Sequence, residues 1–118
     1  MDTKRLMGMM NAPAHKRYKS FCTQAADTEE VWLMQDAPDA PAVQQDSLCV
    51  WPDRAFVSLY RADAVPVMME VHDFMDACRA RMEKQDFVVH VFPNTKDSFD
   101  APVRQLLESL QDELDLVE

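Results

Sequence analysis

The chain has 118 residues, of which 47% are hydrophobic and 28% charged, and its formal net charge is −9. This length and balance fit one globular domain and exclude a disordered chain, and no run approaches the roughly 18 apolar residues that span a bilayer. The negative charge argues against nucleic acid as the main ligand. A single glycine, Gly8, excludes the glycine-rich loops that hold phosphates in Walker-type and dinucleotide-binding proteins.

The charge is unevenly distributed along the chain. Residues 1–20 carry +4 and residues 21–118 carry −13. The basic start has no apolar segment of the kind found in a signal peptide. Three cysteines, Cys22, Cys49 and Cys78, form no C-x-x-C pair. We therefore expect a cytoplasmic protein whose reduced thiols pack as small hydrophobic side chains.

The first predicted elements are a helix and a β-hairpin. A helix is predicted over residues 13–26, with a further short helical turn before it, because one apolar stripe contains Tyr18, Phe21, Cys22 and Ala25. A run rich in branched and aromatic residues predicts a strand over 30–34, and a loosely alternating run predicts its hairpin partner over 43–50. Between them the segment DAPDAP, residues 36–41, predicts an exposed turn.

The segment CVWPDRAF, residues 49–56, predicts a corner at which a strand passes into a helix. The residue before a proline stays extended, so we expect Trp51 to end the strand and Pro52 to begin a helix over 52–61. Cys49 beside a helix start would suit a reactive thiol, but Asp53 has the wrong charge to favour a thiolate there. We favour a buried thiol.

The second half of the chain predicts a strand over 65–69, a helix over 71–84 and a strand over 87–92. The last of these is apolar on both alternating faces except at His90, which predicts a central strand covered on both sides. Asp100 is the predicted N-cap of a final helix that runs to about Leu114. Its apolar seam is typical of a docking or pairing helix and contains Val103, Leu107, Leu110, Leu114 and Val117. Five acids and no base follow Arg104, so we expect the tail to fray or to meet a basic partner.

The histidines give no firm catalytic or metal site. His90 fits a hydrogen-bonded core histidine better than a buried base, because no serine or cysteine nucleophile is tied to it by spacing. His72 with Asp73 and Asp76 is a weak metal candidate, since these three residues do not share one helix face. We therefore predict no catalytic, cofactor-binding or metal-ligating residue, and no cofactor.

Short motifs along the chain resemble one known family. They are Arg17-Tyr18 with Phe21, Glu30-Val31-Trp32, Val50-Trp51-Pro52, Pro66, Phe74, and Val89-His90-Val91-Phe92-Pro93. Their order is similar to the pattern R-Y-x-x-F, E-V-W, V-W-P, d-F and v-x-v-F-P of the small bacterial family called domain of unknown function 2750, over residues 10–95. The sequence departs from that family in the DAPDAP turn and in the acidic tail. The resemblance implies an architecture and a bacterial cytosolic setting, but no catalytic residue.

The expected fold is a small single α+β domain over residues 1–118, with frayed segments at 1–10 and 115–118. We expect an antiparallel sheet of three to four strands with four helices packed against it.

Three functional hypotheses follow from these observations. The first is a non-enzymatic acidic protein-interaction module, comparable by analogy to immunity proteins, which binds a basic protein through the last helix with Leu110 and Leu114. The second is a small-molecule binder or small enzyme with a pocket where Trp32, Trp51 and His90 converge. The third is homodimerisation through residues 103–117. None of them involves a membrane.

Overall fold

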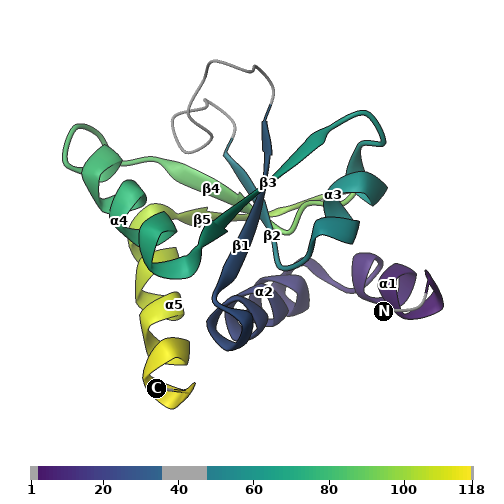
Figure 1. The fold of residues 1–118 in the computed structure, drawn as a ribbon, viewed down its shortest axis with the longest axis horizontal. Coiled ribbons are helices and arrows are strands. Elements are labelled where there is room, and N and C mark those ends of the chain that lie inside the picture. The colour runs from purple at the N-terminus through teal and green to yellow at the C-terminus, as the bar shows by residue number, and fades with distance from the viewer. Residues whose placement is uncertain (1–2, 36–47, 118) are drawn as a thin grey trace.

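The computed structural model describes residues 3–35 and 48–117, which form one α+β domain (Figure 1). The helices in these residues are α1 (Thr3–Met10), α2 (Ala14–Thr28), α3 (Arg54–Tyr60), α4 (Val71–Met82) and α5 (Val103–Val117). The strands are β1 (Glu30–Gln35), β2 (Cys49–Trp51), β3 (Val65–Glu70), β4 (Val88–Val91) and β5 (Phe99–Pro102). The predicted fold class is confirmed. None of these helices has both the length and the apolar character that crossing a membrane requires.

The strands form one mixed sheet in the order β3-β1-β2-β4-β5. β1 pairs antiparallel with β2 and β3, and β4 pairs antiparallel with β5. The prediction of a wholly antiparallel sheet is wrong, because β2 pairs with β4 in parallel. A parallel pair requires a long crossover, and the segment containing α3, β3 and α4 supplies it.

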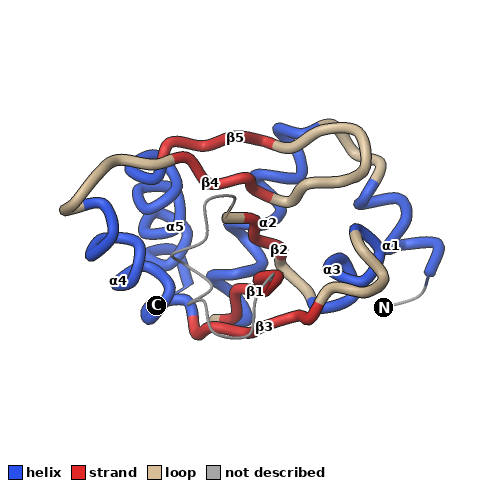
Figure 2. Tube along the Cα trace, turned by 90° about the horizontal axis from the view of Figure 1, so that it is seen from above, coloured by secondary structure: helices blue, strands red, loops and turns tan. Residues whose placement is uncertain are grey.

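Helices α2 and α5 pack together against one face of the sheet (Figure 1). Tyr18 of α2 stacks on Phe99 of β5 with ring centroids 4.3 Å apart, and its hydroxyl lies 2.7 Å from the Ser109 Oγ of α5. Seen from above, α4 and α5 lie at one end of the sheet, and α1 and α3 lie at the other (Figure 2). The core between these layers is lined largely by aliphatic and aromatic side chains.

Several predicted boundaries need correction. The expected helix over 52–61 begins only at Arg54, because Asp53 is its N-cap and accepts a hydrogen bond from the Ala55 amide at 2.9 Å. The described part of the second strand is Cys49–Trp51, while residues 36–47, with the predicted turn and most of that strand, lie outside the described residues.

The C-terminal third differs more from the prediction. β4 is not covered on both faces, since Val88 is 46% exposed. Asp100 is not a helix N-cap but lies in the edge strand β5, which was not predicted, and α5 begins at Val103. Pro102 fits here because β5 is an edge strand, where a missing backbone N–H is tolerated.

Candidate functional site

The centre of the molecule is a corner just after β4, at the dipeptide Phe92-Pro93. Phe92 has a φ of 50°, a left-handed conformation that is uncommon for a bulky residue and for one that precedes proline. Trp51 has no exposed surface, and its indole Nε1 donates to the Pro93 carbonyl at 3.0 Å. Its ring packs against Tyr60 with centroids 5.2 Å apart. Trp51 is therefore a core anchor of this corner.

A buried guanidinium holds the same corner from the other side. Arg17 is 2% exposed, and its Nε donates to the Phe92 carbonyl at 2.8 Å. Nη1 donates to the Ala12 carbonyl, and Nη2 donates to both the carbonyl and the Oδ1 of Asp97. Strained backbone persists only where its surroundings fix it, and here two successive carbonyls each receive a side-chain donor. Arg17 and Trp51 thus serve the fold at this position.

Beside the corner lies a cavity of about 310 Å³. Its walls are Cys49, Tyr60, His90 and the segment 93–98. His90 Nδ1 lies 2.7 Å from Asp100 Oδ1, and the hydroxyl of Ser98 donates to the same oxygen. The hydrogen bonds from Ser98 and His90 lower the pKa of Asp100 below its ordinary value.

The strand register places three of these side chains in one row. Cys49 of β2 is the neighbour of His90 of β4, and His90 is the neighbour of Asp100 of β5. Registered neighbours point to the same face of a sheet, and alternation puts Phe99, which stacks on α2, on the opposite face. The row therefore lies on the face of the sheet away from α2 and α5.

The residues of the predicted pocket do not all line this cavity. His90 does, but its side chain is 34% exposed, so it is not the core histidine that the sequence predicts. Trp32 is half-buried and is the cross-strand neighbour of Trp51, yet neither indole is among the residues that line the cavity.

The leucines of the last helix are buried. Leu110 and Leu114 lie in the core, and Val103, Leu106 and Leu107 accompany them along the same face of α5. The predicted seam is used within the chain except at Val117, which is exposed. After Arg104, the charged residues that α5 exposes are all acidic, namely Glu108, Asp112 and Asp115. Leu116, at its end, is 79% exposed.

The cysteines of the described residues are buried and form no disulfide, as predicted. Desolvation by burial raises the pKa of Cys22 and of Cys78 to about 12 in each case. These two thiols stay protonated at neutral pH. Cys49 differs from them in lining a cavity.

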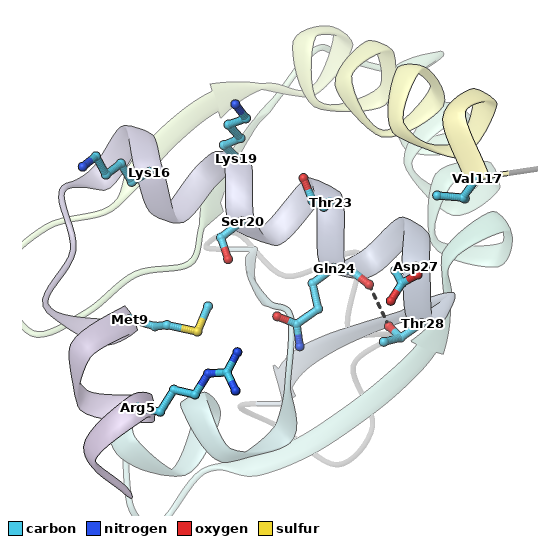
Figure 3. Close-up of a pocket in the computed structure, with 10 residues that line it drawn as sticks. All are labelled: Arg5, Met9, Lys16, Lys19, Ser20, Thr23, Gln24, Asp27, Thr28 and Val117. Atoms are coloured by element: carbon cyan, nitrogen blue, oxygen red, sulfur yellow. Dashed lines mark hydrogen bonds between the residues drawn. The ribbon is translucent and has the colours of Figure 1, made fainter. Parts of the chain in front are cut away.

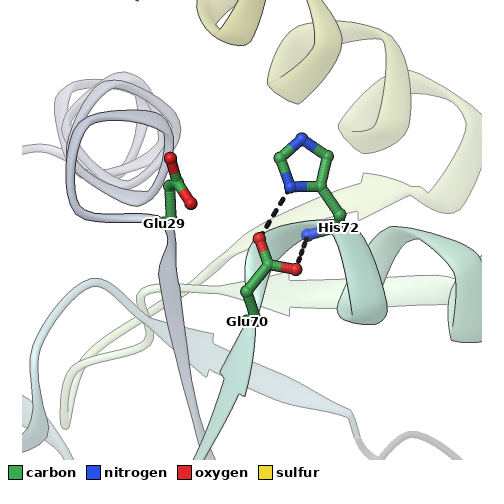
Figure 4. Close-up of side chains that lie close together, drawn as sticks. All are labelled: Glu29, Glu70 and His72. Atoms are coloured by element: carbon green, nitrogen blue, oxygen red, sulfur yellow. Dashed lines mark hydrogen bonds and ion pairs between the residues drawn. The ribbon is translucent and has the colours of Figure 1, made fainter.

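A carboxylate and imidazole cluster lies where β1 and β3 meet α2 and α4 (Figure 4). Glu29, Glu70 and His72 each have one potential ligand atom within 4.8 Å of the others, so His72 meets these carboxylates and not the predicted Asp73 and Asp76. Glu70 also caps α4, because its Oε2 accepts from the amides of His72 and Asp73 at 2.9 and 3.1 Å. Desolvation by burial would raise the pKa of Glu70. Hydrogen bonds from the His72 ring and from these amides outweigh it, so the pKa of Glu70 is lowered. Capping alone accounts for the position of Glu70.

An open groove of about 910 Å³ runs between α1, α2 and the end of α5. Figure 3 shows Arg5 and Met9 extending from α1 toward α2, with Val117 at the far end. Lys16 and Lys19 line it from α2. The basic residues Arg5, Lys16 and Lys19 thus line one groove, and Val117 is the only described residue of α5 that lines it.

Comparisons with known proteins place the chain in a family. A family model described as "Protein of unknown function (DUF2750)" matches residues 18–110. The chain therefore belongs to this family, which confirms the resemblance found in the sequence. No curated protein and no solved structure matches the chain.

The cavity residues are the ones that the sequence did not bring together. Cys49, His90 and Asp100 are joined by the pairing of β2 with β4 and of β4 with β5. The spacing of these three residues along the sequence forms no recognisable motif. The only signal in the sequence was the alternation of apolar and polar residues around His90. That alternation does not show which strands lie next to the strand that contains His90.

Proposed function

We propose that this protein is an acidic protein-interaction module that binds a basic protein through the outer face of α5. The observation that supports this is the division of α5 into two faces: its leucine seam packs in the core, while Glu108, Asp112 and Asp115 face outward. We define these three residues as the acidic face. The proposed setting is the bacterial cytoplasm, where thiols remain reduced.

The acidic face includes one carboxylate that is unfavourable for the helix itself. Asp115 lies in the last turn of α5, where a carboxylate opposes the helix dipole, typically by about 0.3–1 kcal/mol at the surface. No lysine or arginine of the described residues forms an ion pair with these three carboxylates; Asp115 accepts only a hydrogen bond from Gln111 at 3.0 Å. A basic partner would supply the missing positive charge, and complementary charge favours fast and selective association.

The end of α5 adds apolar contact area to the acidic face. Leu116 and Val117 are both exposed large hydrophobic residues. Interfaces commonly combine a small apolar centre with a polar rim. A basic surface with a shallow apolar patch is therefore the kind of partner that we propose.

The test is capture of partners from a bacterial lysate by three versions of the protein, at low and high salt. The acidic-face variant carries Glu108→Gln, Asp112→Asn and Asp115→Asn. The control variant removes the same charge from exposed positions elsewhere, with Asp63→Asn, Asp76→Asn and Glu83→Gln. We expect a salt-sensitive basic partner to bind the wild type and the control variant, and to be lost from the acidic-face variant.

Two outcomes would oppose the proposal. One is that no salt-sensitive partner is captured, and the other is that every captured partner binds the acidic-face variant as well as the wild type. Sedimentation of the wild type at two concentrations shows whether the partner is a second copy of the chain. We expect a monomer, because Leu110 and Leu114 are already buried and two acidic faces repel each other.

The second candidate function, a small-molecule site, is favoured by the cavity at His90. Trp32 and Trp51 are not among the residues that line that cavity. The residues that do line it include Cys49 and His90.

A further inference from the structure

We propose that Cys49 is a reactive thiol, activated by His90 and Asp100, and that the adjoining cavity admits a small polar electrophile which the thiol captures covalently. The inference is independent of the proposed interaction through α5, since the row of three residues lies on the other face of the sheet.

The order of groups in the row is that of a nucleophile, a base and a group that orients the base. Cys49 and His90 are registered neighbours on adjacent strands, which lie about 4.8 Å apart in a sheet. His90 Nδ1 lies 2.7 Å from Asp100 Oδ1. Because a carboxylate accepts the Nδ1 proton, Nε2 is the basic atom of the neutral ring. Asp100 is thus a positioning residue for His90.

A second donor fixes the carboxylate in turn. The Ser98 hydroxyl donates to the same oxygen of Asp100 that His90 contacts. These bonds favour the ionised carboxylate of Asp100, which keeps an acceptor on the Nδ1 side of the His90 ring and leaves Nε2 available to a proton from the thiol. A thiolate next to an imidazolium is the usual form of an activated cysteine.

The surroundings of Cys49 favour this assignment over simple packing. Cys49 is 8% exposed and lines a cavity of about 310 Å³, a size that suits a small ligand. The Asp53 carboxylate accepts from the Ala55 amide at the start of α3, and Asp53 is not among the residues that line the cavity. Lys96 also lines the cavity and contributes a positive charge.

The chemical step needs no additional oxidant or metal. The thiol proton passes to Nε2 of His90, and the sulfur electron pair forms a bond to the electrophilic carbon. The bond from that carbon to its leaving group breaks, and the leaving group departs with the electron pair. When the leaving group is basic, the imidazolium returns the proton to it.

The experiment is alkylation of the folded protein by limiting iodoacetamide, with the modified peptides identified by mass spectrometry. Cys22 and Cys78 are internal controls, since both are buried away from this cavity. We expect Cys49 to be modified first. We also expect the pH profile of its rate to have a midpoint below 9.0, the ordinary pKa of a cysteine.

Two variants separate activation from mere accessibility. His90→Gln and Asp100→Asn should slow the alkylation of Cys49 at neutral pH by about tenfold and move the midpoint to higher pH. Lys84→Gln, in the exposed turn that follows α4 and outside the cavity lining, should change neither. Circular dichroism confirms that each variant is folded.

The wild-type profile tests the proposal even if a variant fails to fold. Modification of Cys49 no faster than that of Cys22 and Cys78, or a midpoint at or above 9.0, would overturn it. An unchanged rate in a folded His90→Gln variant would also overturn it, because the thiol would then be exposed but not activated.

Discussion

At the scale of single residues, the most unusual feature of the core is one buried charged side chain. Arg17 is the only charged side chain that is buried among the described residues, and its guanidinium bonds to three carbonyls and one carboxylate. Its planar fork supplies donors in several directions at once, which the ammonium of a lysine does not. The left-handed Phe92 depends on this arrangement.

The first prediction concerns Arg17. Arg17→Met keeps most of the apolar stem but removes all four hydrogen bonds, and we expect a loss of about 3 kcal/mol in the free energy of unfolding. Arg17→Lys should recover only part of that loss, because one ammonium group reaches fewer of the same acceptors. Urea unfolding followed by circular dichroism measures both variants.

The matched control is Lys19→Met on the exposed side of the same helix, which should change stability by less than about 0.5 kcal/mol. If Arg17→Met were as stable as Lys19→Met, the guanidinium would not be holding the corner, and a binding role for Arg17 would have to be considered.

Residue patterns predicted which side chains are buried better than they predicted which groups those side chains contact. The sequence places Trp51 before Pro52 at a corner, and the structure confirms the corner, but the acceptor of its indole, Pro93, lies in a distant loop. His90 was predicted as a core residue from its apolar neighbours alone. Its partial exposure depends on which segments cover that face, and local spacing carries no such information.

At the scale of elements, the start of α4 depends on its N-cap, Glu70. α4 begins directly after β3, and Glu70 holds this junction by accepting from two backbone amides of α4. The Glu29 carbonyl also accepts from the Val71 amide at 2.8 Å. One glutamate thus ends a strand and caps a helix.

The second prediction concerns Glu70. Glu70→Ala should lower stability by about 1 kcal/mol at neutral pH, as for other N-cap losses. Because the pKa of Glu70 is lowered in the folded protein, its contribution is present above the ordinary glutamate value of 4.5 and is lost as pH falls through the folded value. The difference between variant and wild type should therefore shrink below pH 4.5.

Urea unfolding at several pH values measures this difference, with Glu83→Ala at the other end of α4 as the control. A difference that stays constant from neutral to acid pH would show that the ionised carboxylate is not the stabilising form.

Elements with strong periodicity were predictable, and short paired elements were not. The stripe of α2 and the seam of α5 place both helices within a few residues of their observed bounds. β5 has four residues, including an aspartate and a proline, and only its pairing with β4 makes it a strand. The parallel pairing of β2 with β4 likewise arises from the tertiary arrangement and has no local signal.

At the scale of the whole molecule, the two faces of the sheet serve different purposes. One face packs against α2 and α5, whose outer surfaces carry the basic groove and the acidic face. The other face carries the row of Cys49, His90 and Asp100 beside its cavity. Arg17 and Trp51, by contrast, bond to the carbonyls of Phe92 and Pro93 and hold the corner between them.

The salt dependence of binding between the purified protein and its captured partner tests the proposed function most directly. Exposed charges are screened over about 10 Å at 0.1 M salt, so affinity should fall as salt is raised for the wild type and for the control variant. The acidic-face variant should bind more weakly at low salt and show a shallower dependence. Equal affinity and equal salt dependence for all three proteins would contradict a basic partner bound at α5.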